Sequence, residues 1–201
     1  MTLKLNYIFA LGNFIQYYYT DLTYIHNFQQ HKSGLIKTNE YLMNSPGTFK
    51  AFINEFRVAR NIEKSKTKDL LEYTTRWIAK TKTIQVDDFA YFLKTKGITH
   101  NKTMTSLASK ILFLNDPWKI LPIDNLVKNA VGLKINKYNL YELKFKDFES
   151  RNLNEINKSL ASVQQHVDII ETSFKGKIND IDTIRKNRFL DKILWTIGRN
   201  N

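Results

Sequence analysis

The sequence contains no cysteine among its 201 residues. Disulfide bonds, a thiol nucleophile and zinc sites of the cysteine type are therefore excluded. The four histidines are His26, His31, His100 and His166, and no two of them have the i, i+4 spacing that places a metal-binding pair on one helical face. We therefore expect no metal site and no cofactor.

Glycine and proline are also scarce, with seven and three residues. A sandwich or barrel with many turns would need more of both. Apolar residues instead recur at steps of three and four, as in 7–25, 49–59 and the stripe 153–170. We predict an all-α protein of about 8–10 helices. Gly198 is expected to cap the C-terminus of the last helix.

No long apolar run is present, whereas a membrane-spanning helix needs about 18 such residues. The first eleven residues also lack the small-residue pattern of a signal-peptide cleavage site. We therefore expect an unprocessed cytoplasmic protein that is monomeric and has no membrane partner. The length favours one domain over 1–201. Two packed lobes are the alternative, with N-terminal helices in 1–85, a central region in 86–132 and C-terminal helices in 138–201.

Acidic residues are too few to balance the basic ones. The chain has 31 lysines and arginines against 19 aspartates and glutamates, which gives a formal charge of +12 and a pI near 9.7. This excess is larger than solubility requires and is typical of proteins that bind a polyanion. Nucleic acid is the expected partner.

Two stretches concentrate the positive charge. The segment 93–110 contains four lysines and no acidic residue, interleaved with hydroxyl side chains that suit phosphate hydrogen bonding. The C-terminal helix carries the second stretch. A solvated helical face is the alternative interpretation of both. The predicted DNA contacts are Lys94, Lys96, Lys102, Thr103, Ser106, Arg185 and Arg188.

The region 86–132 departs from the pattern of helices and short loops. Helices are expected at 89–96 and 104–114, joined by the polar connection 97–102. An irregular segment follows at 115–122, with two of the three prolines, and Asp124 then opens another helix. We interpret this segment as a rigid scaffold that orients one acidic side chain.

Two sequences in this region, Ser109-Lys110-Ile111-Leu112-Phe113-Leu114 and Leu121-Pro122-Ile123-Asp124-Asn125-Leu126-Val127, together resemble the core of the helix-hairpin-helix DNA glycosylase superfamily. The resemblance covers residues 86–132. It implies that two helices and their hairpin hold the DNA backbone. It also implies that Asp124 is the family's aspartate at the start of the next helix and Lys110 its lysine. The hairpin of the family is usually glycine-rich, whereas this one contains only Gly97.

Cleavage of an N-glycosidic bond passes through a sugar with oxocarbenium character, which a fixed carboxylate near C1′ stabilises. The resemblance assigns this role to Asp124, and an N-cap is the structural alternative. Lys110 could form a Schiff base with C1′ or contact a phosphate as a surface lysine. Trp118, in the irregular segment, is a candidate for the pocket of a flipped base.

Three functions remain open. The preferred one is a DNA glycosylase that excises a damaged or modified base from double-stranded DNA, in base-excision repair or in defence against modified phage DNA. A non-catalytic nucleic-acid-binding regulator is the second. A metal-dependent nuclease is the third, suggested by the pair Asp87-Asp88, although two acids before an apolar run are also typical of a helix N-terminus.

Overall fold

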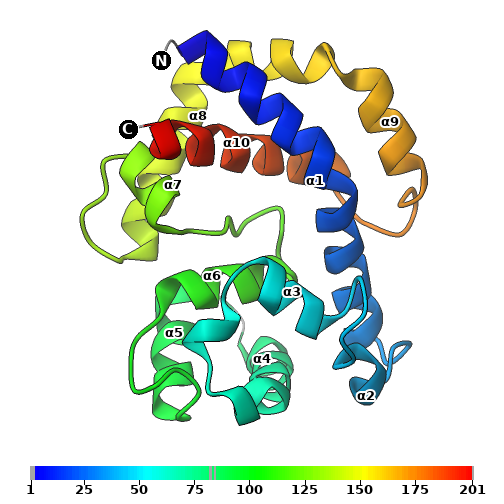
Figure 1. Ribbon diagram of the computed structural model, residues 1–201, viewed down its shortest axis with the longest axis vertical. Helices are drawn as coiled ribbons and strands as arrows, with labels where there is room; N and C mark the ends of the chain where they lie inside the picture. Colours follow the sequence, from blue (N-terminus) through cyan, green and yellow to red (C-terminus); the bar gives the residue numbers. More distant parts are fainter. Residues whose placement is uncertain (1–2, 82, 84, 201) are drawn as a thin grey trace. The chain divides into compact units, whose positions relative to one another are not determined.

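The computed structural model of the protein describes residues 3–81, 83 and 85–200. In these ranges the chain forms α-helices and two short 3₁₀-helices, and no strand (Figure 1). The prediction of an all-α fold is confirmed. The helices are α1 (Leu3–Lys32), α2 (Thr38–Tyr41), α3 (Phe49–Glu55), η1 (Ala59–Asn61), η2 (Lys64–Lys66), α4 (Thr67–Lys80), α5 (Val86–Thr95), α6 (Thr105–Phe113), α7 (Asn125–Ala130), α8 (Tyr138–Ala161), α9 (Gln164–Thr172) and α10 (Ile181–Asn200).

The described helices do not include one that could cross a bilayer, because none combines sufficient length with sufficient apolar character. This finding agrees with the composition, in which apolar residues are interrupted by charged ones throughout most of the chain.

Two compact units make up the chain. Unit 1 consists of Met1–Leu22 and Pro117–Asn201, and unit 2 of Thr23–Asp116. Both ends of the chain therefore belong to unit 1, and the unit boundaries differ from those of the predicted lobes at 1–85, 86–132 and 138–201. The second boundary falls inside the irregular segment that precedes Asp124.

Part of the core of unit 2 comes from apolar positions three or four residues apart on α5 and α6. Helix α5 buries Phe89 and Leu93 completely, and α6 does the same with Leu107 and Ile111. This spacing places each pair on one face, so the two helices pack against each other across that face. Both helices predicted on either side of the polar connection are therefore present.

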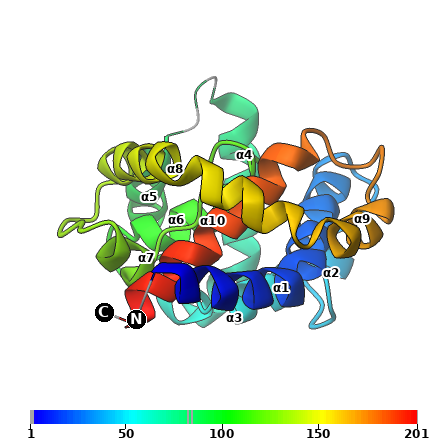
Figure 2. The same ribbon diagram turned by 90° about the horizontal axis from the view of Figure 1, so that it is seen from above.

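Helix α10 is the centre of unit 1 and passes between α1 and α8 (Figure 2). Its Phe189 packs edge-on against Tyr7 and Phe14 of α1. Gly198 does not cap α10, because the helix continues to Asn200. Instead, a Cβ atom at Gly198 would lie 1.9 Å from the Leu126 carbonyl oxygen. The predicted cap is therefore wrong, and the glycine serves the close packing of α10 against α7.

The apolar stripe 153–170 is divided between two helices. Helix α8 ends at Ala161, where the Ser162 hydroxyl donates to the Ser159 carbonyl and satisfies a terminal acceptor. Helix α9 begins at Gln164. The stripe therefore predicted the helical conformation but not the turn, because the turn contains neither glycine nor proline.

We expect a steep loss of stability at alkaline pH, because four tyrosines are buried. Burial is the main cause that raises the pKa of Tyr7 to about 12, and it raises the pKa values of Tyr18, Tyr41 and Tyr141 further. The unfolded chain has ordinary tyrosines with a pKa near ~10. Below pH ~10 these phenols are protonated in both states, and stability is not reduced by their titration. Above that pH only the unfolded state loses the phenolic protons, so the folded state becomes less stable.

Each of these tyrosines is therefore expected to cost about 1.4 kcal/mol of unfolding free energy for every pH unit above ~10. The tyrosinate absorbance of all four should appear together with the loss of helical circular dichroism. Titration of all the tyrosines near their ordinary pKa with the helices intact would contradict the burial on which this prediction rests.

Candidate functional site

Asp124 occupies the N-cap of α7 in unit 1. One of its carboxylate oxygens accepts a hydrogen bond from the Val127 N–H at 3.0 Å, and the backbone of Asp124 is extended. The N-cap role considered from the sequence is thus present. Within the described residues the other carboxylate oxygen takes part in no hydrogen bond or ion pair, so capping leaves half of this half-buried carboxylate for chemistry.

The irregular segment before Asp124 is fixed to unit 1 at two points. The Tyr138 hydroxyl of α8 accepts from the Leu121 N–H at 2.8 Å. The Asn187 side chain of α10 donates to the carbonyl oxygens of Trp118 at 3.0 Å and Pro117 at 3.3 Å. A segment without regular secondary structure is thereby held at both ends, as a scaffold for an acidic side chain requires.

A buried cluster of charged and phenolic groups lies within electrostatic reach of Asp124. Arg188 is only 1% exposed and forms ion pairs with Asp21 at 2.8 Å and Asp191 at 3.1 Å. Burial raises the pKa of Asp191 against the opposing effect of Arg188, and the charge of Asp124 raises it further. Burial also raises the pKa of Tyr141, as do the charges of Asp191 and Asp124.

This cluster corrects the sequence-based assignment of Arg188 as a DNA contact. Its guanidinium is enclosed and already binds two carboxylates, so it cannot reach a phosphate. The sequence pattern could not reveal this, because Arg188 follows two other basic residues on a helix that appeared amphipathic.

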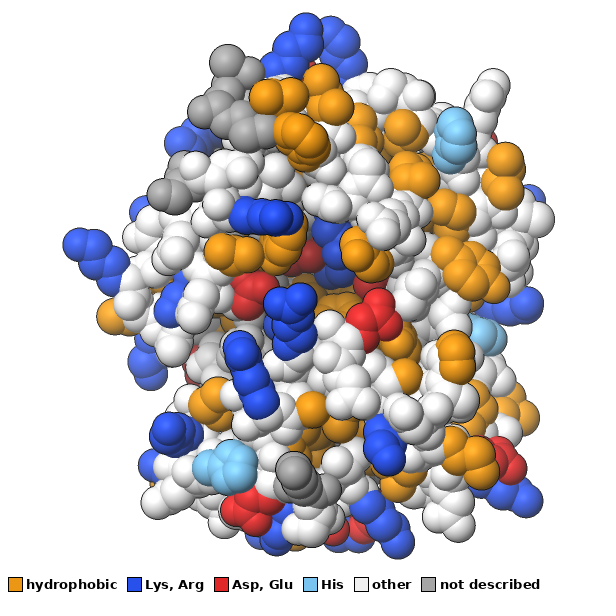
Figure 3. Space-filling model, viewed as in Figure 1, with side chains coloured by type: hydrophobic (Ala, Val, Ile, Leu, Met, Phe, Trp, Pro, Cys, Tyr) orange, Lys and Arg blue, Asp and Glu red, His pale blue; other side chains and the backbone are white. Residues whose placement is uncertain are grey.

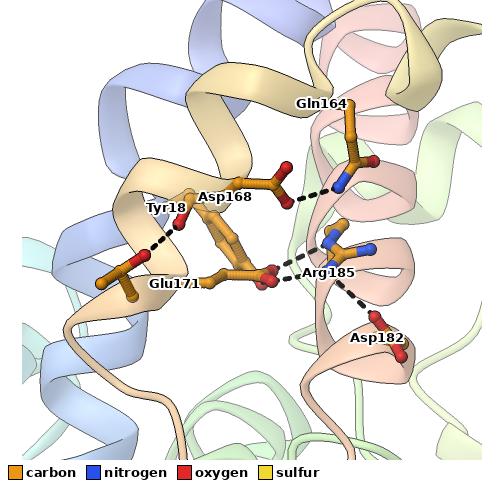
Figure 4. A network of polar contacts seen from close by, with 7 residues as sticks. Tyr18, Gln164, Asp168, Glu171, Asp182 and Arg185 are labelled. Atoms are coloured by element: carbon orange, nitrogen blue, oxygen red, sulfur yellow. Dashed lines mark hydrogen bonds and ion pairs between the residues drawn. The ribbon is translucent and has the colours of Figure 1, made fainter.

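Two further cations of the same helix, Arg185 and Lys186, also form ion pairs. The Arg185 guanidinium donates to the Glu171 carboxylate at 2.8 Å and forms an ion pair with Asp182 at 2.9 Å (Figure 4). Lys186 binds Glu149 at 2.6 Å. The hydrogen bonds to Glu171 raise the pKa of Arg185. Arg185 therefore links α9 to α10, and its assignment as a DNA contact stays a prediction.

Two cations on α10 lie over aromatic rings. Lys192 lies 5.0 Å from the centre of the Tyr17 ring, and Arg199 lies 5.3 Å from that of Trp195. Such contacts orient the cation without neutralising it. In the described residues, the charges of Lys192 and Arg199 are thus not paired with a carboxylate, unlike those of Arg185 and Arg188.

Lys110 lies on α6 in unit 2, whereas Asp124 belongs to unit 1. Its amine donates a hydrogen bond of 3.0 Å to the Phe56 carbonyl oxygen, and the side chain is half-buried. The Lys110 amine is thus directed at a backbone carbonyl of its own unit. Its assignment as a nucleophile or as a phosphate contact stays a prediction.

The connection between α5 and α6 contains three residues with a positive φ angle, Gly97, His100 and Asn101. The last two form a tight turn, closed by a 2.8 Å hydrogen bond from the Lys102 N–H to the Thr99 carbonyl. Asparagine tolerates this conformation better than most residues other than glycine. The connection therefore contains one glycine, Gly97, and has His100 and Asn101 where the resemblance leads us to expect small residues.

The predicted phosphate contacts of this hairpin all lie in unit 2. Lys96, Lys102 and Thr103 are exposed, whereas Lys94 and Ser106 are half-buried. The Lys96 ammonium lies 5.6 Å from the centre of the Phe92 ring, which restricts its direction. The structure thus leaves these side chains accessible at the hairpin and beside it, in contrast to Arg185 and Arg188.

Arg57 is a further exposed cation that the sequence did not reveal. It has a φ angle of 55° at the position after α3 where glycine is the usual residue, and the Val58 N–H closes the motif on the Ile53 carbonyl at 2.9 Å. The preceding residue, Phe56, is the acceptor of Lys110. A left-handed arginine thus lies directly beside the residue that accepts from Lys110.

Trp118 is half-buried, and its carbonyl is fixed by Asn187. Its assignment to a base pocket stays a prediction. The metal-site alternative has no support in the described residues, which contain no group of three or more His, Cys, Asp or Glu side chains arranged to hold an ion. Asp87 instead accepts a 3.3 Å hydrogen bond from the Thr105 hydroxyl and links the starts of α5 and α6.

Comparison of the chain with protein-family models, with curated proteins and with solved structures finds no significant match.

Proposed function

We propose that the protein is a DNA glycosylase that hydrolyses the bond between a damaged or modified base and its deoxyribose. The observation that carries the proposal is Asp124, which is held at the start of α7 by a fixed loop with one carboxylate oxygen left without a partner among the described residues. In the glycosylase superfamily that residues 86–132 resemble, the aspartate in this position is the essential carboxylate.

In the proposed reaction the bond between C1′ and the base nitrogen breaks, and water supplies a hydroxyl to C1′. The displaced base takes up a proton from the solvent. The Asp124 carboxylate stabilises the positive charge that develops on the sugar, accepts the proton of the attacking water and then releases it to the solvent.

The test is an excision assay in EDTA on duplexes with oxidised, alkylated, deaminated or phage-type modified bases. We expect release of a free base and an intact abasic strand that breaks only after alkali. Borohydride should trap little or no covalent adduct, because water and not Lys110 is the nucleophile of the proposed reaction. A trapped adduct that disappears in Lys110→Gln would instead make Lys110 the nucleophile of a combined glycosylase and lyase.

Two results of this assay would reject the proposal. Tight DNA binding without release of any base would favour the regulator that binds nucleic acid without chemistry. Strand cleavage that stops on addition of EDTA would favour the nuclease.

DNA binding is expected to depend steeply on salt, because the proposed contacts of the hairpin are to phosphates. Replacement of Lys94, Lys96 and Lys102 by glutamine should reduce the slope of log affinity against log salt by about 0.9 for each phosphate that the variant no longer neutralises. The affinity for unrelated sequences should fall equally. Binding isotherms at several salt concentrations measure both effects.

A matched control is the replacement of Lys144, Lys146 and Lys158 by glutamine, because these lysines lie on α8 of unit 1 and outside the hairpin. The control removes the same net charge. If both triple variants weakened binding to the same extent, the hairpin would not be the interface.

A further inference from the structure

The first half of α1 is unusual in this chain because it lacks charge. Between Leu5 and Thr20 there is no lysine, arginine, aspartate or glutamate, although a quarter of all residues are charged. A helical segment with so many apolar and no charged residues is more typical of a buried helix than of one at the surface.

Only one face of this helix is buried. Tyr7, Ala10, Phe14 and Tyr18 point into the core of unit 1. The opposite face, which we call the outer α1 face, consists of exposed positions spaced by three and four residues. They are Leu5, Ile8, Phe9, Gly12, Gln16 and Tyr19.

The outer α1 face is apolar. The exposed fractions are 40% for Leu5, 57% for Ile8 and 51% for both Phe9 and Tyr19. Figure 3, which shows the same side of the molecule as Figure 1, has hydrophobic side chains gathered along the course of α1. Several large apolar side chains on one exposed face, rather than scattered singly, are typical of an interaction site.

Gly12 lies in the middle of this face. A glycine inside a helix costs about 1 kcal/mol relative to alanine. The fold does not require it, because a Cβ atom would meet nothing within 4 Å, and its φ angle is not among the positive ones. A glycine at the centre of an exposed apolar face allows the backbone of another helix to approach closely.

We propose that the outer α1 face binds the same face of a second copy of this chain, so that two α1 helices cross near Gly12. Two chains that each carry +12 repel one another, and contact is favoured where the surface is free of charge. A two-fold axis places identical patches opposite each other, and an uncharged apolar face is complementary to itself.

The same features argue against other occupants. A polyanion would gain no ion pair on this face. An interfacial membrane helix carries lysine and arginine along its polar side, whereas the other side of α1 is buried in unit 1. The proposal replaces the expected monomer, and it does not depend on the proposed glycosylase activity.

Sedimentation of the full chain over a range of concentrations tests the proposal. The wild type is expected to dimerise reversibly, and Ile8→Glu should weaken dimerisation at least about 30-fold, as the removal of a central apolar anchor does. Leu143→Glu is the matched control, because Leu143 is an exposed leucine on α8 of the same unit. Its dimerisation should equal that of the wild type.

Gly12→Ala separates a role in association from a role in folding. Alanine favours the helix, so the variant should be at least as stable as the wild type, while dimerisation weakens about tenfold or more because the helices can no longer approach. A wild type that remains monomeric at all concentrations would overturn the proposal, as would equal dimerisation by Ile8→Glu. Binding of a monomeric wild type to phosphatidylserine vesicles, abolished in Ile8→Glu, would assign the face to a membrane instead.

Discussion

Replacement of Asp124 by asparagine should lower the rate of base release by a factor of about 10²–10³ or more, as the removal of one transition-state interaction does in other enzymes. The carboxylate charge disappears, while the side chain keeps its size. Asparagine is as good an N-cap as aspartate, so the hydrogen bond from the Val127 N–H should persist. Single-turnover kinetics on a substrate found by the excision assay measure the effect.

The stability of the Asp124→Asn variant should equal that of the wild type, and its DNA affinity should be equal or slightly higher because a negative charge has been removed. Asp88→Asn is the matched control, since Asp88 is an exposed aspartate in the first turn of α5. Full activity in Asp124→Asn would remove this residue from the mechanism. A parallel loss of stability and activity would reduce Asp124 to a helix cap.

Asp124 could be found from the sequence because its local context is informative. An aspartate after a proline-containing segment and before an apolar helical pattern predicts a helix start, and the observed α7 begins directly after it. The apolar spacing likewise predicted α5 and α6. These features depend on residues close together in the chain, which a single sequence displays.

Arg188 shows what the sequence could not display. Its partners are Asp21, which lies 167 positions earlier, and Asp191 on the same helix. A basic residue on a basic helix gives no sign of such a distant carboxylate. The left-handed conformation of Arg57 was missed for a different reason, because it depends on where α3 ends and arginine is not a residue type expected at that position.

The second large effect is expected on stability, when the buried ion pairs of unit 1 lose their cation. Replacement of Arg188 by methionine should reduce the free energy of unfolding by about 3–5 kcal/mol, because Asp21 and Asp191 would remain buried without their cation. Methionine fills most of the arginine volume, so a cavity contributes little. The control Arg151→Met breaks an exposed ion pair with Asp147 and should cost less than about 1 kcal/mol.

The deficit of Arg188→Met relative to the wild type should also depend on pH. Arg188 opposes the rise in the pKa of Asp191 that burial causes, so its removal raises that pKa further. A carboxyl with a folded pKa above its unfolded value binds more protons in the folded state, and stability therefore increases as the pH falls. Denaturant unfolding at pH ~7 and ~5 should show the deficit shrinking at the lower pH. A deficit that is small, or that grows towards acid, would mean that the two carboxylates are not held buried by Arg188.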